Sequence, residues 1–182
     1  MPRRSARRCT ATTNVPGCTF APEFTIDGWA VADSSDIDLR GVKIVDLADN
    51  TRLITRGGHR MAVNALRAKR ARLDGSLSVA SGLKITGGLE MSGGSSLGLP
   101  TDHRTAFVQS ISLKGEGPVA IKPGAAPSSG RFVDFLRMGE APADLSRFRL
   151  DLSDGPDDAV YRSTKYSRHS TLSVKKGTRR VK

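Results

Sequence analysis

The sequence predicts an all-β fold: a right-handed parallel β-solenoid with short rungs, closed by a strand-rich C-terminal cap. Within residues 73–99, apolar residues come in pairs spaced by two, which places both members on one face of a strand. The pairs are Leu77 and Val79, Leu83 and Ile85, Leu89 and Met91, and Leu97 and Leu99. The composition, with 19 glycines, 9 prolines and 5% aromatic residues, favours short strands over long helices. An antiparallel β-sandwich or meander with glycine-rich turns is the alternative.

The first three apolar pairs recur every six residues, and the last follows after eight. We interpret each unit as a three-residue strand and a three-residue turn, which forms one rung stacked on the next. The apolar residues of 77–91 then point inward. Ser78, Lys84 and Glu90 point outward at the same place on successive rungs, so Lys84 and Glu90 are predicted to be neighbours. The residues that would supply the backbone freedom for turning are Gly82, Gly87, Gly88, Gly93 and Gly94.

The chain divides into a basic irregular tail (1–22), a single β domain (23–175) and a basic tail (176–182). Within the domain, residues 37–99 are predicted to form the rungs and 105–175 the cap. Short strands are expected before the repeat, over residues 24–47 and 52–55. Trp29, the only tryptophan, is interpreted as a core residue or as a cap over the first rung, with a carbohydrate-stacking platform as the alternative.

Residues 59–73 fit two structures. As a helix they place Met61, Leu66 and Leu73 loosely on one side, with arginines around the rest. As two strands they alternate apolar and polar residues, and we favour strands because the flanking segments are strands. After the repeat, strands are expected at 106–115, 117–122, 131–138, 147–153, 159–166 and 170–176, the last two as a hairpin.

The net charge of +11 is concentrated at the two ends of the chain. Residues 1–8 and 159–182 contain twelve basic residues and no acid, which leaves 17 basic and 18 acidic residues between them. The candidate anion-binding residues are Arg162, Lys165, Lys175, Lys176, Arg179 and Arg180. A second interpretation is that these cations deter edge-to-edge pairing of an open solenoid end. The partner is unknown, with an anionic polymer or surface glycan as the candidates.

No catalytic constellation is visible in the sequence. The three histidines, His59, His103 and His169, lie far apart in the sequence, and no two of them have the spacing of metal ligands. We therefore expect no enzymatic activity, no cofactor and no metal. Two acidic clusters could instead offer calcium ligands or simply be turn residues: Asp33, Asp36 and Asp38, and Asp151, Asp154, Asp157 and Asp158.

The compartment also has two interpretations. Cys9 and Cys18 either form a disulfide or remain free thiols. No apolar run is long enough to span a bilayer, and the basic N-terminus is not followed by the apolar core of a signal peptide. The sequence thus predicts a cytoplasmic protein if the chain is complete, and a secreted or cell-surface protein if it belongs to a longer chain.

The stretch GSLSVASGLKITGGLEMSGGSSL resembles the autotransporter-associated β-strand repeats of secreted bacterial proteins. The segments at 112–138 and 147–174 look like the closing part of such a region, so the resemblance covers roughly residues 37–175. Bactofilin-like filament proteins show a similar glycine-punctuated rhythm. The resemblance implies a non-enzymatic structural or adhesive β-solenoid module of a secreted or surface protein. The alternative is a small nucleic-acid-binding protein that uses its basic termini and residues 60–72.

Overall fold

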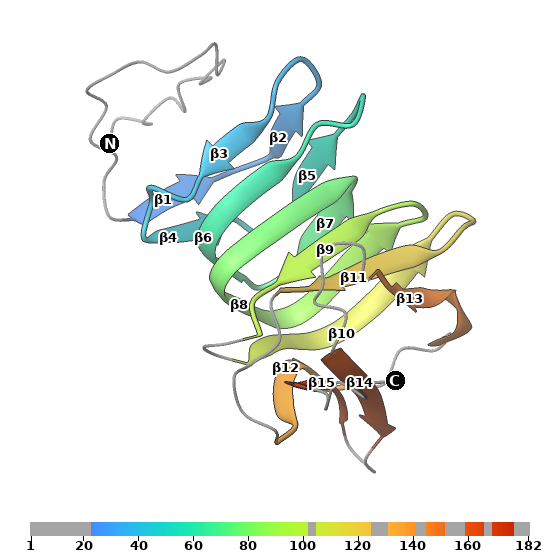
Figure 1. The fold of residues 1–182 in the computed structure, drawn as a ribbon. Coiled ribbons are helices and arrows are strands. Elements are labelled where there is room, and N and C mark those ends of the chain that lie inside the picture. Colours follow the sequence, from blue (N-terminus) through green and yellow to red (C-terminus); the bar gives the residue numbers. More distant parts are fainter. Residues whose placement is uncertain are drawn as a thin grey trace, which may run out of the picture.

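The computed structural model describes residues 23–101, 105–124, 131–140, 145–151, 159–165 and 169–176. The fold is all-β, a parallel β-solenoid of about five turns with mixed strands at its C-terminal end (Figure 1). The predicted fold class is therefore confirmed, and the antiparallel meander is wrong. The tail at 1–22, with Cys9 and Cys18, lies outside the described residues, as do residues 177–182.

The turns have three sides, so the strands stack into three parallel columns, here called faces A, B and C. Face A contains β1 (Glu23–Ile26), β4 (Ile44–Leu47), the second half of β6 (Met61–Ala68), the middle of β8 (Ser76–Ser92), the start of β10 (Ala106–Lys114) and β12 (Val133–Met138). Face B contains β2 (Trp29–Ala32), β5 (Thr51–Thr55), β7 (Ala71–Asp74) and the ends of β8 and β10. Face C contains β3 (Ile37–Leu39), the starts of β6 and β8, β9 (Ser96–Leu99), β11 (Val119–Pro123) and β13 (Phe148–Leu150).

The six-residue repeat is not a stack of rungs, and that prediction is wrong. The apolar pairs at 77–79, 83–85 and 89–91 lie on faces C, A and B of a single turn, within the one long strand β8. The neighbours of Leu77 across the sheet are Met61, 16 residues earlier, and Leu97, 20 residues later. β8 bends at the corners of the turn but stays paired with β6 and β10. The pairing register shifts at the corners, between Val63 and Ala65 and between Val108 and Ser110, and the pairing continues beyond them.

The inward direction of the apolar residues is confirmed. Each residue of the β8 pairs is buried, and each stacks on an apolar residue of the preceding turn. On face A, one such ladder runs through Ile26, Leu47, Ala68, Ile85, Val108 and Met138. Aliphatic side chains stacked in this way remove apolar surface from water at every turn, which is the main stabilising contribution available to a solenoid.

Residues 59–73 form strands, β6 and β7, as favoured, and not a helix. Trp29, however, is 76% exposed on the outer side of β2, so its assignment to the core is wrong. The alternation of β2 explains the outcome, because Ala30 and Ala32 take the inward positions.

The C-terminal end is closed by antiparallel strands. β15 (Ser170–Lys176) pairs with β12, and β14 (Ala159–Lys165) pairs with β15, so the predicted hairpin is present, although residues 166–168 lie outside the described part. Val174 and Phe135 are buried in the core at this end. A short 3-10 helix (Leu145–Arg147) precedes β13, and the Arg147 guanidinium donates to the carbonyl oxygens of Gly115 (2.7 Å) and Gly117 (2.9 Å).

Candidate functional site

The outer surface is organised by ion pairs that join one turn to the next. Arg67 donates two hydrogen bonds of 2.8 Å to the Asp46 carboxylate, its register partner on face A. Arg70 donates to both oxygens of Asp49, at 2.9 and 2.6 Å. Paired hydrogen bonds of this kind fix the geometry of the carboxylate as well as its charge. Both arginines therefore hold the third turn against the second.

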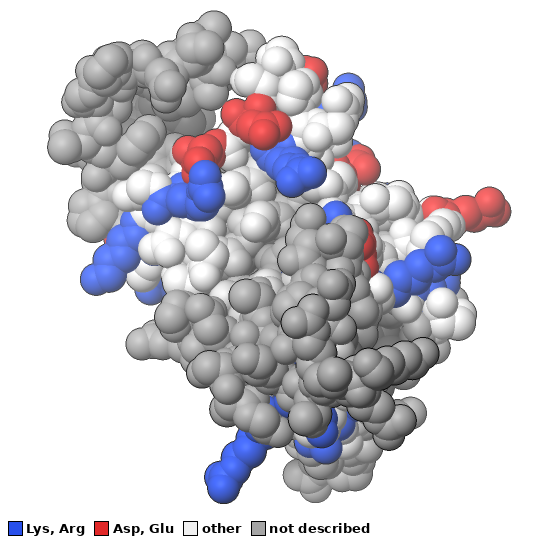
Figure 2. Space-filling view, in the orientation of Figure 1, with Lys and Arg blue, Asp and Glu red and all other residues white. Residues whose placement is uncertain are grey.

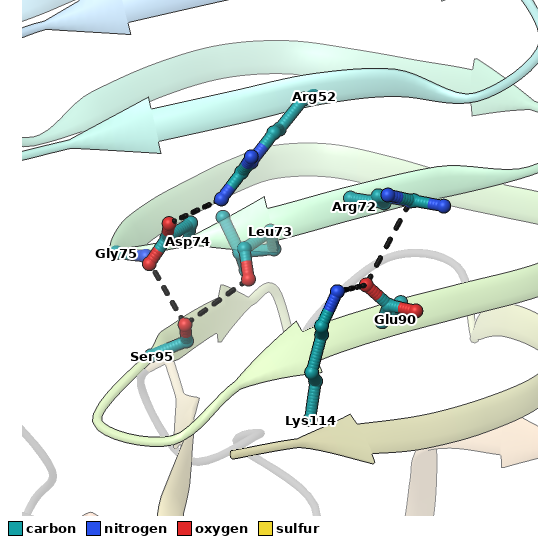
Figure 3. Close-up of polar contacts among 8 residues, drawn as sticks. All are labelled: Arg52, Arg72, Leu73, Asp74, Gly75, Glu90, Ser95 and Lys114. Atoms are coloured by element: carbon teal, nitrogen blue, oxygen red, sulfur yellow. Dashed lines mark hydrogen bonds and ion pairs between the residues drawn. The ribbon is translucent and has the colours of Figure 1, made fainter.

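Face B continues the same arrangement (Figure 3). Arg52 donates to Asp74 at 2.9 Å, and Glu90 lies 3.7 Å from Arg72 and 3.8 Å from Lys114, which belong to the turns on either side. The predicted neighbour pair of Lys84 and Glu90 is wrong, because Lys84 lies on face A and Glu90 on face B. On the described part of the surface in Figure 2, several basic side chains lie directly against acidic ones.

These pairs change the acidity of the carboxylates. Hydrogen bonding by Arg67 holds the pKa of Asp46 below its ordinary value of 3.8, against the opposing effect of burial. Arg70 lowers the pKa of Asp49 in the same way, and Arg40 lowers that of Asp38. The three carboxylates are therefore ionised at neutral pH and available for charge pairing.

The predicted basic stretch 60–72 is not a free cationic surface. Arg67, Arg70 and Arg72 face carboxylates of neighbouring turns, as described above. Arg60 and Lys69 are exposed. Most of the positive charge of this stretch is consequently matched by acidic side chains, which weakens its attraction for a polyanion.

The C-terminal cations lie on the hairpin that closes the solenoid. The guanidinium carbon of Arg162 on β14 is 4.1 Å from the centre of the Phe132 ring, and Lys175 Nζ on β15 is 4.9 Å from it. Both distances are within the range of cation–π contacts. Lys165 and Lys176 belong to these strands, but their side chains, like Arg179 and Arg180, lie outside the described part. The structure thus brings two of the six candidate residues together around one aromatic ring.

His59 and the described residues of the two acidic clusters take ordinary surface positions. His59 Nδ1 lies 3.4 Å from Asp36, which also accepts a 2.8 Å hydrogen bond from the Arg60 backbone. Asp38 pairs with Arg40, and Asp151 pairs with Lys122 at 2.9 Å. His103 and residues 152–158 are not described. Within the described ranges, no group of three or more His, Cys, Asp or Glu side chains could hold a metal ion.

An open groove of about 380 Å³ lies on face C. It forms because Ser78 and Gly98, register partners on adjacent turns, occupy outward positions with small side chains, while Arg60 and Lys122 lie at its margins. Ser96 and Ser76 also line the groove, and the Ser96 hydroxyl donates a 2.9 Å hydrogen bond to the Ser76 hydroxyl. The groove offers polar groups but no convergent catalytic set.

The ion pairs between turns were not recognised in the sequence. Their signal is a shared offset: Asp46 and Asp49 are three apart, Arg67 and Arg70 are three apart, and the two pairs lie 21 residues from each other. The offset of 21 residues equals the length of one turn at this point of the solenoid. Among the described ion pairs only these two show it, so it does not stand out in the sequence.

No helix in the described residues is long and apolar enough to cross a membrane. Comparisons with family models, with curated proteins and with solved structures gave no match. The β-solenoid of about five turns therefore stands as the established feature of the chain.

Proposed function

We propose that this chain is a non-enzymatic structural or adhesive β-solenoid module of a secreted or cell-surface bacterial protein. The observation that carries the proposal is the continuous stacking of five turns, with an aliphatic ladder inside and ion pairs between turns outside. Such a body is stiff along its axis and presents long, flat faces, which suits a spacer or a surface for attachment. The resemblance of residues 37–175 to autotransporter-associated repeats supports the extracellular location.

Surface exposure of the natural gene product tests the location. Intact cells of the source organism are treated with a protease, and the chain is followed with an antibody against residues 23–101. The proposal expects the antigen in the medium, or cleaved on intact cells while a cytoplasmic marker survives. An antigen that is degraded only after the cells are broken open would contradict an extracellular location.

A polyanion-binding function has one specific observation in its favour. Arg162 and Lys175 are held together over Phe132, and residues 159–182 contain no acid. A DNA duplex is a suitable probe, because binding driven by phosphate neutralisation weakens steeply as salt is raised. Under this second proposal, Arg162→Ala with Lys175→Ala weakens binding and reduces the salt dependence. Unchanged binding by that variant would remove the hairpin from the proposal.

A further inference from the structure

Among the described residues, strands cover the first turn of the solenoid on one side only. β1, β2 and β3 pair with the second turn and, within the described residues, with no strand on the other side. Ala32 is buried, but the other inward side chains of the first turn are only partly buried: Phe24, Ile26, Ala30, Ile37 and Leu39. Their register partners in the second turn are fully inside the core: Val45, Leu47, Leu53, Met61 and Val63. The first turn therefore carries apolar side chains at the same inward positions as the second turn, where a further turn covers them.

Further apolar surface is exposed on this turn. Trp29 is 76% exposed and Val31 is 40% exposed, both on the outer side of β2. Each of the strands β1, β2 and β3 has one edge without a partner strand in the described part of the chain. Such edges, next to partly buried apolar side chains, form a template for pairing with another segment. A partner that adds strands here would complete both the ladder and the core.

The charge of this end restricts the partner. Residues 23–39 contain five acidic side chains and no lysine or arginine: Glu23, Asp27, Asp33, Asp36 and Asp38. Asp38 pairs with Arg40, and Glu23 lies 3.4 Å from Arg67. In the described ion pairs, Asp27, Asp33 and Asp36 have no lysine or arginine partner, and their negative charge would make two such ends repel each other. The partner is expected to present a basic strand edge.

The opposite end of the same chain has that property. β14 and β15 carry Arg162, Lys165, Lys175 and Lys176, and residues 159–176 contain no acid. In the described residues β14 pairs only with β15, so its other edge is open. In Figure 1 the hairpin and the strands β1 to β3 lie at opposite ends of the solenoid.

The direction of β14 also fits. β15 runs antiparallel to β12, and β14 runs antiparallel to β15, so β14 has the same direction as every face A strand from β1 to β12. A second copy added along the axis in the same orientation would place its β1 parallel to β14. Parallel pairing also joins β1 to β4, β4 to β6 and β6 to β8 on this face.

We infer that this protein binds a second copy of itself head to tail, with β1 and the acidic first turn of one copy against the basic edge of β14 in the other. Like charges disfavour the head-to-head and tail-to-tail arrangements. The basic hairpin therefore deters pairing with another basic hairpin, but not pairing with an acidic first turn. Because the two surfaces differ, the contact does not close on itself and repeats into an open chain of copies. The inference goes beyond the proposed function, because a surface module can equally remain a monomer.

Sedimentation velocity and negative-stain electron microscopy of the full chain test this inference. At low ionic strength we expect a concentration-dependent series of elongated species beyond the dimer. Raising the salt from 0.1 M to 1 M shortens the Debye length from about 10 Å to about 3 Å and should shift the series towards monomer. A monomer at all concentrations, or a closed dimer that grows no further, would overturn the inference.

Charge reversal identifies the surfaces. Arg162→Glu and Asp27→Lys are each expected to weaken association by about tenfold or more, and an equimolar mixture of the two variants should recover it, because the reversed ends complement each other. Lys69→Glu is the matched control: the side chain is exposed in the middle of the solenoid, and the charge change equals that of Arg162→Glu. Circular dichroism confirms that each variant is folded.

Two results would refute the assigned contact. Equal losses from Lys69→Glu and Arg162→Glu would mean that total charge alone governs association. A monomeric full chain that associates only when residues 1–22 are deleted would mean that those residues, not a second copy, occupy the first turn.

Discussion

At the residue scale, the alternation of side chains decides nearly everything that the sequence could predict. The inward row of β8 was predictable because spacing by two is a local property of an extended chain. The exposed position of Trp29 was not predictable, since a large aromatic residue is expected to be buried. Trp29 points outward because Ala30 and Ala32 occupy the inward positions of β2. Ion pairs such as Arg67 with Asp46 depend on the turn length, which single residues do not reveal.

The core ladder gives the largest predicted effect of a single substitution. Ile85 is buried between Ala68 and Val108 on face A, so Ile85→Ala leaves a cavity shared by three turns. We expect a loss of about 2–5 kcal/mol in the free energy of unfolding, measured by urea denaturation. Lys84→Ala, one position away and exposed, serves as the control and should be nearly neutral. Equal small effects from both variants would mean that this stretch is not part of a packed core.

The Arg67–Asp46 pair predicts a pH dependence. The pKa of Asp46 is lowered in the folded state, so its contribution to stability is present above the ordinary value of 3.8 and is lost as the pH falls through the lower, folded-state pKa. At pH 7, Asp46→Asn should lower the Tm by a few degrees or less, because the pair is largely exposed. Once the pH has fallen below the lowered folded-state pKa of Asp46, the Tm values of variant and wild type should converge. A difference in Tm that does not change with pH would contradict the assigned ion pair.

At the element scale, the strands were predicted more reliably than their partners. Period-two segments are visible in the sequence, and the segments predicted after Leu99 correspond to β10 to β15. The sequence did not reveal which strands are neighbours, because a six-residue unit fits both a whole rung and one side of a three-sided turn. Only the spacing between stacked residues, such as the 20 residues from Leu77 to Leu97, distinguishes these two structures. That spacing is hard to detect in the sequence because the loops differ in length.

The turn after β8 offers a test at this scale. Gly93 lies where the loops of two successive turns touch, and a Cβ atom there would overlap the carbonyl oxygen of Glu116. The loops must separate to admit any side chain, which would strain the hydrogen bonds from Gly93 to Lys114 and from Gly94 to Pro118. Gly93→Ala should therefore cost about 1–3 kcal/mol of stability in urea denaturation.

Gly41→Ala is the control for Gly93→Ala. A Cβ atom added at Gly41 would meet no other atom within 4 Å, so this substitution should leave stability almost unchanged or raise it slightly. Similar free energies of unfolding for the two variants would show that the loops at Gly93 and Glu116 are not in contact.

At the scale of the whole molecule, the distribution of charge determines how the solenoid is used. The middle of the chain is nearly neutral because its basic and acidic residues are almost equal in number, and several of them pair between turns. Residues 23–39 contain acids but no lysine or arginine, and the final hairpin contains basic residues but no acid. The sequence showed the basic C-terminal end clearly. The matching acidic end became visible only when the structure placed residues 23–39 together as one turn, with described partner strands on one side alone.

The central claim is that successive apolar pairs of β8 are the sides of one turn and that the stacking partners lie a full turn away. Cysteine cross-linking tests it in a background with Cys9 and Cys18 replaced by serine. Ala62 and Ser78 are register partners on face C, at a separation of about 5 Å expected for neighbouring strands, so Ala62→Cys with Ser78→Cys should form a disulfide under mild oxidation. Ser78 and Lys84 lie on different faces of the same turn, so Ser78→Cys with Lys84→Cys should remain reduced. The reverse result, a disulfide between positions 78 and 84 and none between 62 and 78 in peptide mass spectra, would show six-residue rungs and contradict this structure.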